Sequence, residues 1–251
     1  MENQGRKVVS TKKLILAIGL PNFINDYLFL NFMVELVAFD WNGTLLADTQ
    51  ACMDAGNHVI ETFGGEPLPR KRYTEVFDFP AVDFYCAQGA DREALLAPDS
   101  PRVFHDFYEP RASKCRTRRG AREVLSWLND NAIDSVILSN HMQDAIITQL
   151  QRLGIDGYIA EVLANTELID SQSGKNKIER MVDYLSRANH DPADAAIVGD
   201  SPEDIEIGKT LGMATIAITD GYFSTPRLRA CNPDYLVSNL VKIVHILENH
   251  Q

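Results

Sequence analysis

Five short apolar runs, each of strand length, constrain what this chain can fold into. They are VELVAF (34–39), DSVILS (134–139), YIAEVL (158–163), AAIVG (195–199) and ATIAI (214–218). Stretches of helical period lie between the later runs, with apolar residues at i, i+3, i+4 and i+7 over 121–128 and 178–185. Continuous apolar strands that alternate with amphipathic helices indicate a parallel sheet covered on both faces. The sequence therefore predicts an α/β fold with a doubly wound, Rossmann-like sheet.

One region breaks this alternation. Residues 47–117 carry no clear strand and consist of helical-looking segments around a turn rich in proline, arginine and lysine. They follow the first strand directly, and Gly120 with the segment AREVLSWL restarts the alternation. We therefore expect a core domain built from residues 33–46 and 118–251, with a helical cap domain inserted at 47–117.

The first 32 residues belong to neither predicted domain. KKLILAIGL is a basic region with a short apolar run that stops at Pro21, and no small-residue cleavage site follows it. A membrane span in this segment would have to bury Pro21 and several Asn and Asp side chains, which hydrocarbon does not tolerate. We expect residues 1–32 to be an extension, either preceding a native start at Met33 or forming a loosely attached arm.

The charge balance limits the partners. Against 24 Lys and Arg stand 35 Asp and Glu, a formal net charge of −11. This balance argues against nucleic acid and against anionic membrane surfaces. An anionic small substrate remains compatible with it where a cation neutralises the site locally. The four cysteines are scattered without a CxxC pair, which is typical of reduced thiols in a cytoplasmic protein. Nothing in the sequence determines the oligomeric state.

Polar residues stand where the predicted strands end. The first strand ends at Asp40, the second at Ser139 and Asn140, and the fourth at Asp200. In a doubly wound sheet ligands bind beyond the carboxyl ends of the strands. We therefore expect a carboxylate nucleophile, a hydroxyl and a second acid to meet on one rim. Lys175, which opens the helix before the fourth strand, adds a cation there.

These motifs, taken in order, resemble the haloacid dehalogenase superfamily, in particular its phosphoglycolate-phosphatase-like members with a helical cap. DWNGTLLAD is similar to the first motif, DxDGT, and VILSN resembles the second. Lys175 in SGKNKIERM matches the third, and IVGDSPEDI resembles the fourth, GDxxxD. FDFPAVDFYCAQGAD is similar to the cap of a subset of members whose first motif also reads DWNGT. The resemblance covers residues 34–248.

The resemblance implies a Mg²⁺-dependent phosphomonoester hydrolase that acts through an aspartyl-phosphate on a small phosphorylated metabolite. Asp40 would be the nucleophile. Ser139 would donate to a transferring phosphoryl oxygen, and Lys175 would stabilise the transition state. Lys177 is the alternative to Lys175, which fits the spacing better.

The resemblance also implies a ligand set for Mg²⁺ and a cradle for the phosphate. The ion would be held by Asp40, the backbone carbonyl of Asn42, Asp200 and, directly or through water, Asp204. The phosphate would lie against Gly43, Thr44, Ser139, Asn140 and Lys175. For Asp204 a purely structural role as a helix N-terminal acid is the alternative.

Asn42 departs from the family pattern. In phosphatases of this superfamily that position holds the second acid of DxDGT, which protonates the leaving group and activates water. An amide cannot move a proton, and general acid–base catalysis contributes typically about 10²–10⁴-fold. We therefore expect slow turnover of alkyl phosphates and a smaller loss for aryl, acyl or anhydride phosphates. From the sequence alone, Asn42→Asp is expected to raise the activity.

Two other functions stay open at this point. One is a phosphate-binding or regulatory protein with little turnover, and the other is a dehalogenase or phosphonate hydrolase, which also lack the second acid. Of the remaining polar residues, we expect His141 to be a surface residue at a helix start. We expect the cluster Arg70-Lys71-Arg72 to be a solvated turn that does not contact the substrate.

Overall fold

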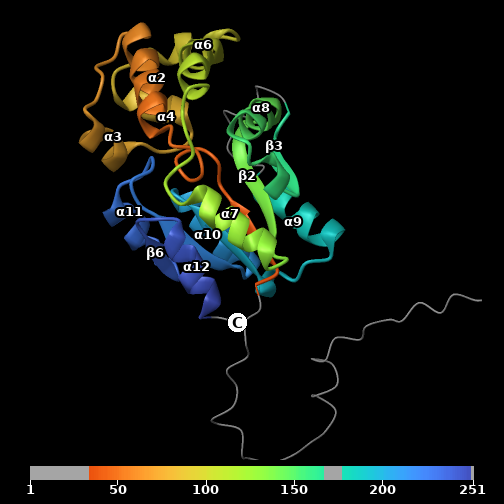
Figure 1. Cartoon of the computed structure of the whole chain (residues 1–251). Coiled ribbons are helices and arrows are strands. Elements are labelled where there is room, and N and C mark those ends of the chain that lie inside the picture. The colour runs from red at the N-terminus through yellow and green to blue at the C-terminus, as the bar shows by residue number, and fades with distance from the viewer. Residues whose placement is uncertain (1–33, 167–176, 250–251) are drawn as a thin grey trace, which may run out of the picture. The chain divides into compact units, whose positions relative to one another are not determined.

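The computed structural model describes residues 34–166 and 177–249 and contains one parallel sheet. Its six strands lie in the order β3-β2-β1-β4-β5-β6 (Figure 1). Their bounds are Leu36–Phe39 (β1), Asp134–Met142 (β2), Glu161–Asn165 (β3), Ala195–Gly199 (β4), Ala214–Ile218 (β5) and Tyr235–Val237 (β6). Every neighbouring pair is parallel. The predicted α/β, doubly wound fold is confirmed.

Helices cover both faces of the sheet because the strands are apolar on both sides. In β1, Val37 and Phe39 point into a core shared with α7 (Ala121–Asp130), α8 (Gln143–Leu153) and α12 (Val241–Glu248). Leu36 and Ala38 point the other way, towards α9 (Lys177–Ala188) and α10 (Pro202–Leu211). All four strand residues are fully buried. The two amphipathic helices expected over 121–128 and 178–185 are α7 and α9.

Five of the six helices between β1 and β2 lie within residues 47–117, and the sixth is α7. The five are α2 (Thr49–Thr62), α3 (Arg70–Val76), α4 (Ala81–Ala87), α5 (Arg92–Leu95) and α6 (Ser100–Ala112). They gather at one end of the sheet, above the carboxyl ends of β1 and β2 (Figure 1). We call residues 47–117 the cap segment. Its apolar side chains form a cluster in which Tyr73 packs edge-on against Phe84 and stacks on Phe77, and this cluster continues into the core domain at Ile205, Ala217, Phe223 and Leu228.

The cap segment leaves and rejoins the sheet at one place. The amide of Ala47 donates to the carbonyl of Arg116 at 2.9 Å, and the amide of Arg118 donates to the carbonyl of Leu45 at 2.7 Å. These two bonds flank an antiparallel bridge between Leu46 and Thr117. The two chain crossings are therefore tied to each other, directly beside the loop that follows β1.

Two predictions of strand position need correction. The third strand begins at Glu161, three residues later than expected, because Asp156–Tyr158 forms a 3₁₀ turn. β6 is not among the expected strands because it is three residues long and only Val237 is buried. A short half-exposed strand gives no periodic signal. In the chain, α11 (Thr225–Ala230) lies between β5 and β6.

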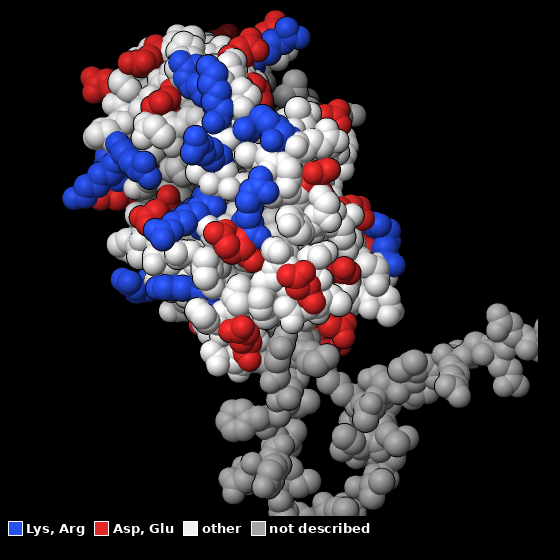
Figure 2. All heavy atoms as spheres, in the orientation of Figure 1, with Lys and Arg blue, Asp and Glu red and all other residues white. Residues whose placement is uncertain are grey.

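The surface charge is uneven although the chain is acidic. Figure 2 shows Lys and Arg side chains spread down one face of the molecule. The end of α6 and its connection to α7 carry exposed Arg111, Lys114, Arg116 and Arg119, and residues 110–120 include no acid. The absence of nucleic-acid partners, inferred from the whole-chain charge, therefore stays a prediction. No helix within the described ranges is long and apolar enough to cross a membrane. The segment 1–32 lies outside those ranges.

Candidate active site

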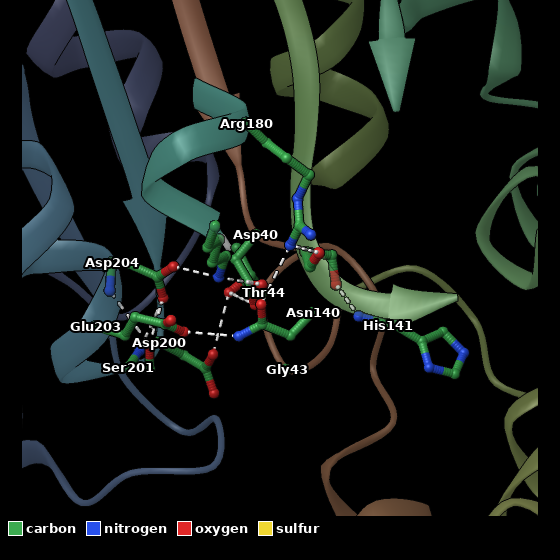
Figure 3. A network of polar contacts seen from close by, with 12 residues as sticks. Asp40, Gly43, Thr44, Asn140, His141, Arg180, Asp200, Ser201, Glu203 and Asp204 are labelled. Carbon is green, nitrogen blue, oxygen red and sulfur yellow. Dashed lines mark hydrogen bonds and ion pairs between the residues drawn. The ribbon is translucent and has the colours of Figure 1, made fainter. Parts of the chain in front are cut away.

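Asp40 is the first residue after β1, and its side chain lies at the carboxyl edge of the sheet. Its amide donates to the carbonyl of Val198 at 2.8 Å, which fixes the residue beside the end of β4. One carboxylate oxygen accepts from Lys177 Nζ at 2.9 Å, and the other from Thr44 Oγ1 at 3.2 Å. The predicted nucleophile is therefore buried and held on both oxygens (Figure 3).

Lys177 is the first residue of α9 and is only 3% exposed. Its ammonium bridges Asp40 at 2.9 Å and Asp204 at 2.6 Å. A cation at a helix N-terminus is opposed by the helix dipole. The two carboxylates offset both that opposition and the cost of burial. Lys175, the lysine preferred on spacing, lies outside the described residues, whereas its alternative Lys177 lies in the site.

Three carboxylates surround this lysine and Thr44. Ligand oxygens of Asp40, Asp200 and Asp204 all lie within 4.8 Å of one another. Thr44 Oγ1 lies between the first two, 3.3 Å from Asp200 Oδ1. The other oxygen of Asp200 accepts from the amide of Tyr222, in the loop after β5. The chain thus brings acids from the ends of β1 and β4 together, as their positions in the sequence predict.

Asp204 is tied into the start of α10. Its Oδ2 accepts from the hydroxyl of Ser201 at 2.7 Å and from its amide at 3.2 Å, and the Ser201 hydroxyl accepts in return from the Asp204 amide. This is a capping box, which satisfies free donors of the first helical turn. Since Oδ1 already accepts from Lys177, both oxygens of Asp204 are engaged. These contacts favour a role in holding Lys177.

Two glycines keep the site compact. A Cβ at Gly199, the last residue of β4, would collide with the carboxyl group of Asp204. A Cβ at Gly43 would collide with that of Asp200, and Gly43 also has φ +73°, which non-glycine residues rarely adopt. Arg118 holds the same turn from the cap crossing, because its guanidinium donates to the Gly43 carbonyl at 2.5 Å and to the Thr219 carbonyl at 2.7 Å.

The site carries more negative charge than its lysine balances. Burial raises the pKa of Asp40 to about 7, with Lys177 acting against this rise and Asp204 adding to it. Burial and the nearby Asp40 raise the pKa of Asp200 as well. A bound divalent cation would relieve this repulsion. Carboxylate oxygens together with a backbone carbonyl are a donor set that suits Mg²⁺. The residues present therefore fit the metal that the sequence predicts.

The second motif forms the opposite wall. Ser139 is 1% exposed, and its hydroxyl accepts from the amide of His141 at 3.1 Å. The side-chain amide of Asn140 donates to Glu203 at 2.9 Å. Arg180 of α9 donates to the carbonyl of Ser139 at 2.9 Å and to Asn140 Oδ1 at 3.2 Å. Arg180 thus holds the C-terminal end of β2 in place (Figure 3), a role for which the sequence offered no motif.

Asn42 is held by Asp48, a carboxylate that is fully buried. Asn42 Nδ2 donates to Asp48 Oδ2 at 2.8 Å and to the hydroxyl of Tyr108 at 2.7 Å. Asp48 also accepts from the Gly43 amide at 2.7 Å and from the hydroxyls of Tyr108 at 2.6 Å and Tyr222 at 2.7 Å. Tyr108 belongs to α6, so this network joins the helices of the cap segment to the loop that follows β1.

His141 is not the surface residue that the sequence predicts. It is 9% exposed, and its Nε2 lies 3.3 Å from Oε1 of Glu109 in α6. His105, also in α6, lies 3.7 Å from the same oxygen. His141 lies near the end of β2, where α6 of the cap segment covers it and buries a side chain that would otherwise face solvent. By contrast, Arg70, Lys71 and Arg72 are exposed, as predicted, but they form the first turn of α3 and not a turn between elements.

One cavity of about 190 Å³ spans the site and the cap segment. Its polar end is lined by Asp40, Asn42, Ser139, Asn140, Lys177 and Asp200. Its other end is lined by aromatic and aliphatic side chains of the cap segment and of the loop after β5, among them Phe77, Phe79, Val82, Phe104 and Phe223. Of the predicted phosphate-binding residues in the described ranges, Ser139 and Asn140 line this cavity, and we call its apolar end the chamber.

Comparison with known proteins places the chain. Residues 37–218 match the family model described as haloacid dehalogenase-like hydrolase. A phosphoglycolate phosphatase of Synechococcus elongatus is 22% identical over 208 residues, covering 81% of this chain and 92% of that protein. A pyrophosphatase PpaX of Bacillus velezensis is 22% identical over 213 residues, covering 85% and 96%.

A solved structure shares the fold. The crystal structure of a predicted phosphatase from Clostridium acetobutylicum superposes with a TM-score of 0.69 at 20% identity, over 86% of this chain and 99% of that one. The family match spans both the cap segment and most of the core, including Asp40, Ser139 and Asp200. The chain therefore belongs to the haloacid dehalogenase-like hydrolase family.

Proposed function

We propose that this chain is a Mg²⁺-dependent phosphomonoester hydrolase that works through an aspartyl-phosphate on Asp40. The observation that supports it most is the buried arrangement of Asp40, Asp200 and Lys177 at the carboxyl ends of β1 and β4. Asp40, Asp200 and the Asn42 carbonyl would hold the ion, with Asp204 nearby to orient Lys177 or to bind through water. When bound, Mg²⁺ would offset the repulsion between a phosphate dianion and the nucleophile.

The chain's own groups supply the remaining steps. An oxygen of Asp40 attacks phosphorus, and the bond from phosphorus to the leaving oxygen breaks with its electron pair. Lys177 and the Ser139 hydroxyl stabilise the charge on the phosphoryl oxygens. Water then attacks phosphorus, the bond to Asp40 breaks, and inorganic phosphate leaves. The cap segment limits the access of other water during transfer.

A small phosphorylated metabolite is the substrate class that suits this cavity, in keeping with the phosphatase names of two relatives. The alternative functions have less support. A dehalogenase needs no metal, which leaves the acids of the fourth motif without a role. A phosphate-binding protein without turnover would be consistent with Asn42, and the same assay distinguishes it.

The test is hydrolysis of p-nitrophenyl phosphate with and without Mg²⁺, for the unmodified protein, Asp40→Asn and Asp130→Asn. Asp130 is an exposed acid at the end of α7 and serves as the matched control. We expect Mg²⁺-dependent hydrolysis that Asp40→Asn abolishes and Asp130→Asn preserves. Activity that survives Asp40→Asn contradicts the proposal. Phosphate binding without hydrolysis points to the binding protein, and metal-free halide release points to the dehalogenase.

A further inference from the structure

We infer that the substrate is an aryl phosphate whose ring occupies the apolar end of the cavity; this inference rests on the proposed function and specifies its substrate class. Two independent observations lead to it. The first is the chemical character of the cavity wall, and the second is the missing proton donor at position 42.

The apolar end of the cavity is an aromatic chamber. Phe77 lines its wall, with a ring centroid 5.2 Å from that of Phe79 and 5.5 Å from that of Phe223. Val82 and Phe104 line the same end. Phe79 is 40% exposed although it is large and apolar, and it lines the cavity. A cavity of about 150 Å³ is enough to hold a benzene ring, so the volume present suits one small ring together with a phosphate group.

The chamber offers no counter-charge for a second anionic group. Among the described residues that line the cavity, Lys177 is the one Lys or Arg. Its ammonium is already paired with the carboxylates of Asp40 and Asp204. The histidines at the wall, His105 and His141, both face Glu109, which offsets any positive charge they carry. A carboxylate or second phosphate in the chamber would lose its hydration without a partner, which is costly.

The catalytic loop independently favours a good leaving group. Asn42 cannot protonate a departing oxygen, and both donors of its amide are taken up by Asp48 and Tyr108. A phenolate leaves readily without help because a phenol has a pKa of about 10, far below that of an alcohol. The electron pair of the broken P–O bond stays on the phenolate, which takes its proton from solvent. The water that later releases phosphate from Asp40 supplies the matching proton.

Of the phosphate classes with good leaving groups, aryl phosphates match the chamber best. Anhydride phosphates carry charged remainders, and acyl phosphates place a polar carbonyl between the phosphate and the apolar wall. Apolar alkyl phosphates match the chamber but need a proton donor. An aryl phosphate matches the chamber and needs no proton donor.

A binding experiment tests the chamber without requiring turnover. Calorimetry with Mg²⁺ compares benzylphosphonate, the stable analogue of phenyl phosphate, with 3-phosphonopropionate, the analogue of phosphoglycolate. We expect benzylphosphonate to bind at least about tenfold more tightly, as for a well-filled apolar pocket. Equal affinity, tighter binding of 3-phosphonopropionate, or binding of neither overturns the inference.

A charge placed in the chamber should reverse this preference. Val82→Lys puts a cation at the cavity wall, and Val182→Lys is the matched control because Val182 is 49% exposed on α9. We expect Val82→Lys to lower the affinity for benzylphosphonate and raise that for 3-phosphonopropionate, and Val182→Lys to change neither. An unchanged preference in a folded Val82→Lys protein contradicts the assignment of the ring to this chamber.

Turnover measurements distinguish the effect of the leaving group from the effect of ring binding. Phenyl phosphate and 2-phenylethyl phosphate both carry a ring, but only the first releases a phenolate. We expect kcat for phenyl phosphate to exceed that for 2-phenylethyl phosphate by about 10²-fold or more, the range that general acid catalysis would otherwise supply. Equal kcat values overturn the leaving-group argument. Selective binding of benzylphosphonate with hydrolysis of neither ester refutes the proposed hydrolysis, while the ring-binding chamber stands.

Discussion

Lys177 is the residue whose environment says most about its role. Its ammonium is buried between Asp40 and Asp204, and a cation at the first position of α9 gains nothing from the helix dipole. We expect Lys177→Met to lower kcat by about 10²–10³-fold, as for the loss of one transition-state donor. Lys175→Met is the control and should change kcat by less than about threefold. Steady-state kinetics on the two variants settles which lysine acts.

The opposite result has a clear meaning. If Lys175→Met removes the activity and Lys177→Met spares it, the lysine preferred on spacing is the catalytic one and Lys177 is structural. Folding must be checked in Lys177→Met by circular dichroism, because it leaves two buried carboxylates without their partner, a loss of about 3–5 kcal/mol.

The contacts of Asn42 change what is expected of Asn42→Asp. A carboxylate at position 42 would face Asp48 across the 2.8 Å now spanned by a hydrogen bond. We expect Asn42→Asp alone to destabilise the protein by about 1–3 kcal/mol, as for a buried group that loses its partner. It should not gain the full activity that the sequence alone predicts.

Exchanging the residues at positions 42 and 48 should restore the hydrogen bond between an amide and a carboxylate. Asn42→Asp combined with Asp48→Asn keeps one amide opposite one carboxylate and places the acid beside the cavity. We expect the double variant to regain stability in urea unfolding and to hydrolyse 2-phenylethyl phosphate about 10²-fold faster than the unmodified protein. Additive destabilisation of the two changes would show that the pair does not interact.

At the scale of elements, α6 contacts the core through Glu109. His141, near the end of β2, lies 3.3 Å from this carboxylate, and His105 of α6 lies 3.7 Å from it. Burial raises the pKa of Glu109, but hydrogen bonds and charge from the two histidines outweigh it and lower the pKa to about 2. Ionised Glu109 therefore contributes its full stabilisation of the fold above its ordinary pKa of 4.5. This contribution is lost as the pH falls towards 2 and the carboxylate becomes protonated.

Urea unfolding at pH 5, 4 and 3 checks this sign. We expect the difference between the unmodified protein and Glu109→Gln to shrink as the pH falls, from a value below about 1 kcal/mol because the side chain is 38% exposed. Glu61→Gln, an exposed acid of α2, should show no such trend. A difference that grows on acidification would mean that the histidines do not stabilise the ionised form.

The sequence predicts the contacts at the strand ends but not those between the cap segment and the core. Asp40 and Asp200 meet because apolar runs fix the strands and parallel pairing brings strand ends to one edge. The choice between Lys175 and Lys177 depends on where α9 begins, and helix starts are uncertain by one or two residues in any sequence. Asp48 finds Tyr108 and Tyr222 at sequence separations of 60 and 174. No local pattern encodes such partners, so the cap contacts and the buried state of His141 had to come from the structure.

For the molecule as a whole, the excess of buried acids predicts that metal binding and stability are linked. A ligand that binds only the folded state stabilises it by mass action, by about 2.7 kcal/mol at a hundredfold excess over Kd. We expect Mg²⁺ to raise the melting temperature and a chelator to reverse the rise. Asp200→Asn should abolish the Mg²⁺ effect, whereas Asp130→Asn should retain it. An identical rise in both variants would indicate non-specific screening of the charge of −11.

The paired chain crossings at Leu46 and Thr117 have a consequence for how this protein can diversify. Since the inserted helices begin and end at neighbouring backbone atoms, a different insert can join the sheet at the same junction without a change in the strands. Such an insert must also replace contacts such as that between Glu109 and His141, while Asp40 keeps its place at the end of β1. Arg118 restricts such exchange, because this residue of the junction also donates a hydrogen bond to the carbonyl of Gly43 and so must be kept.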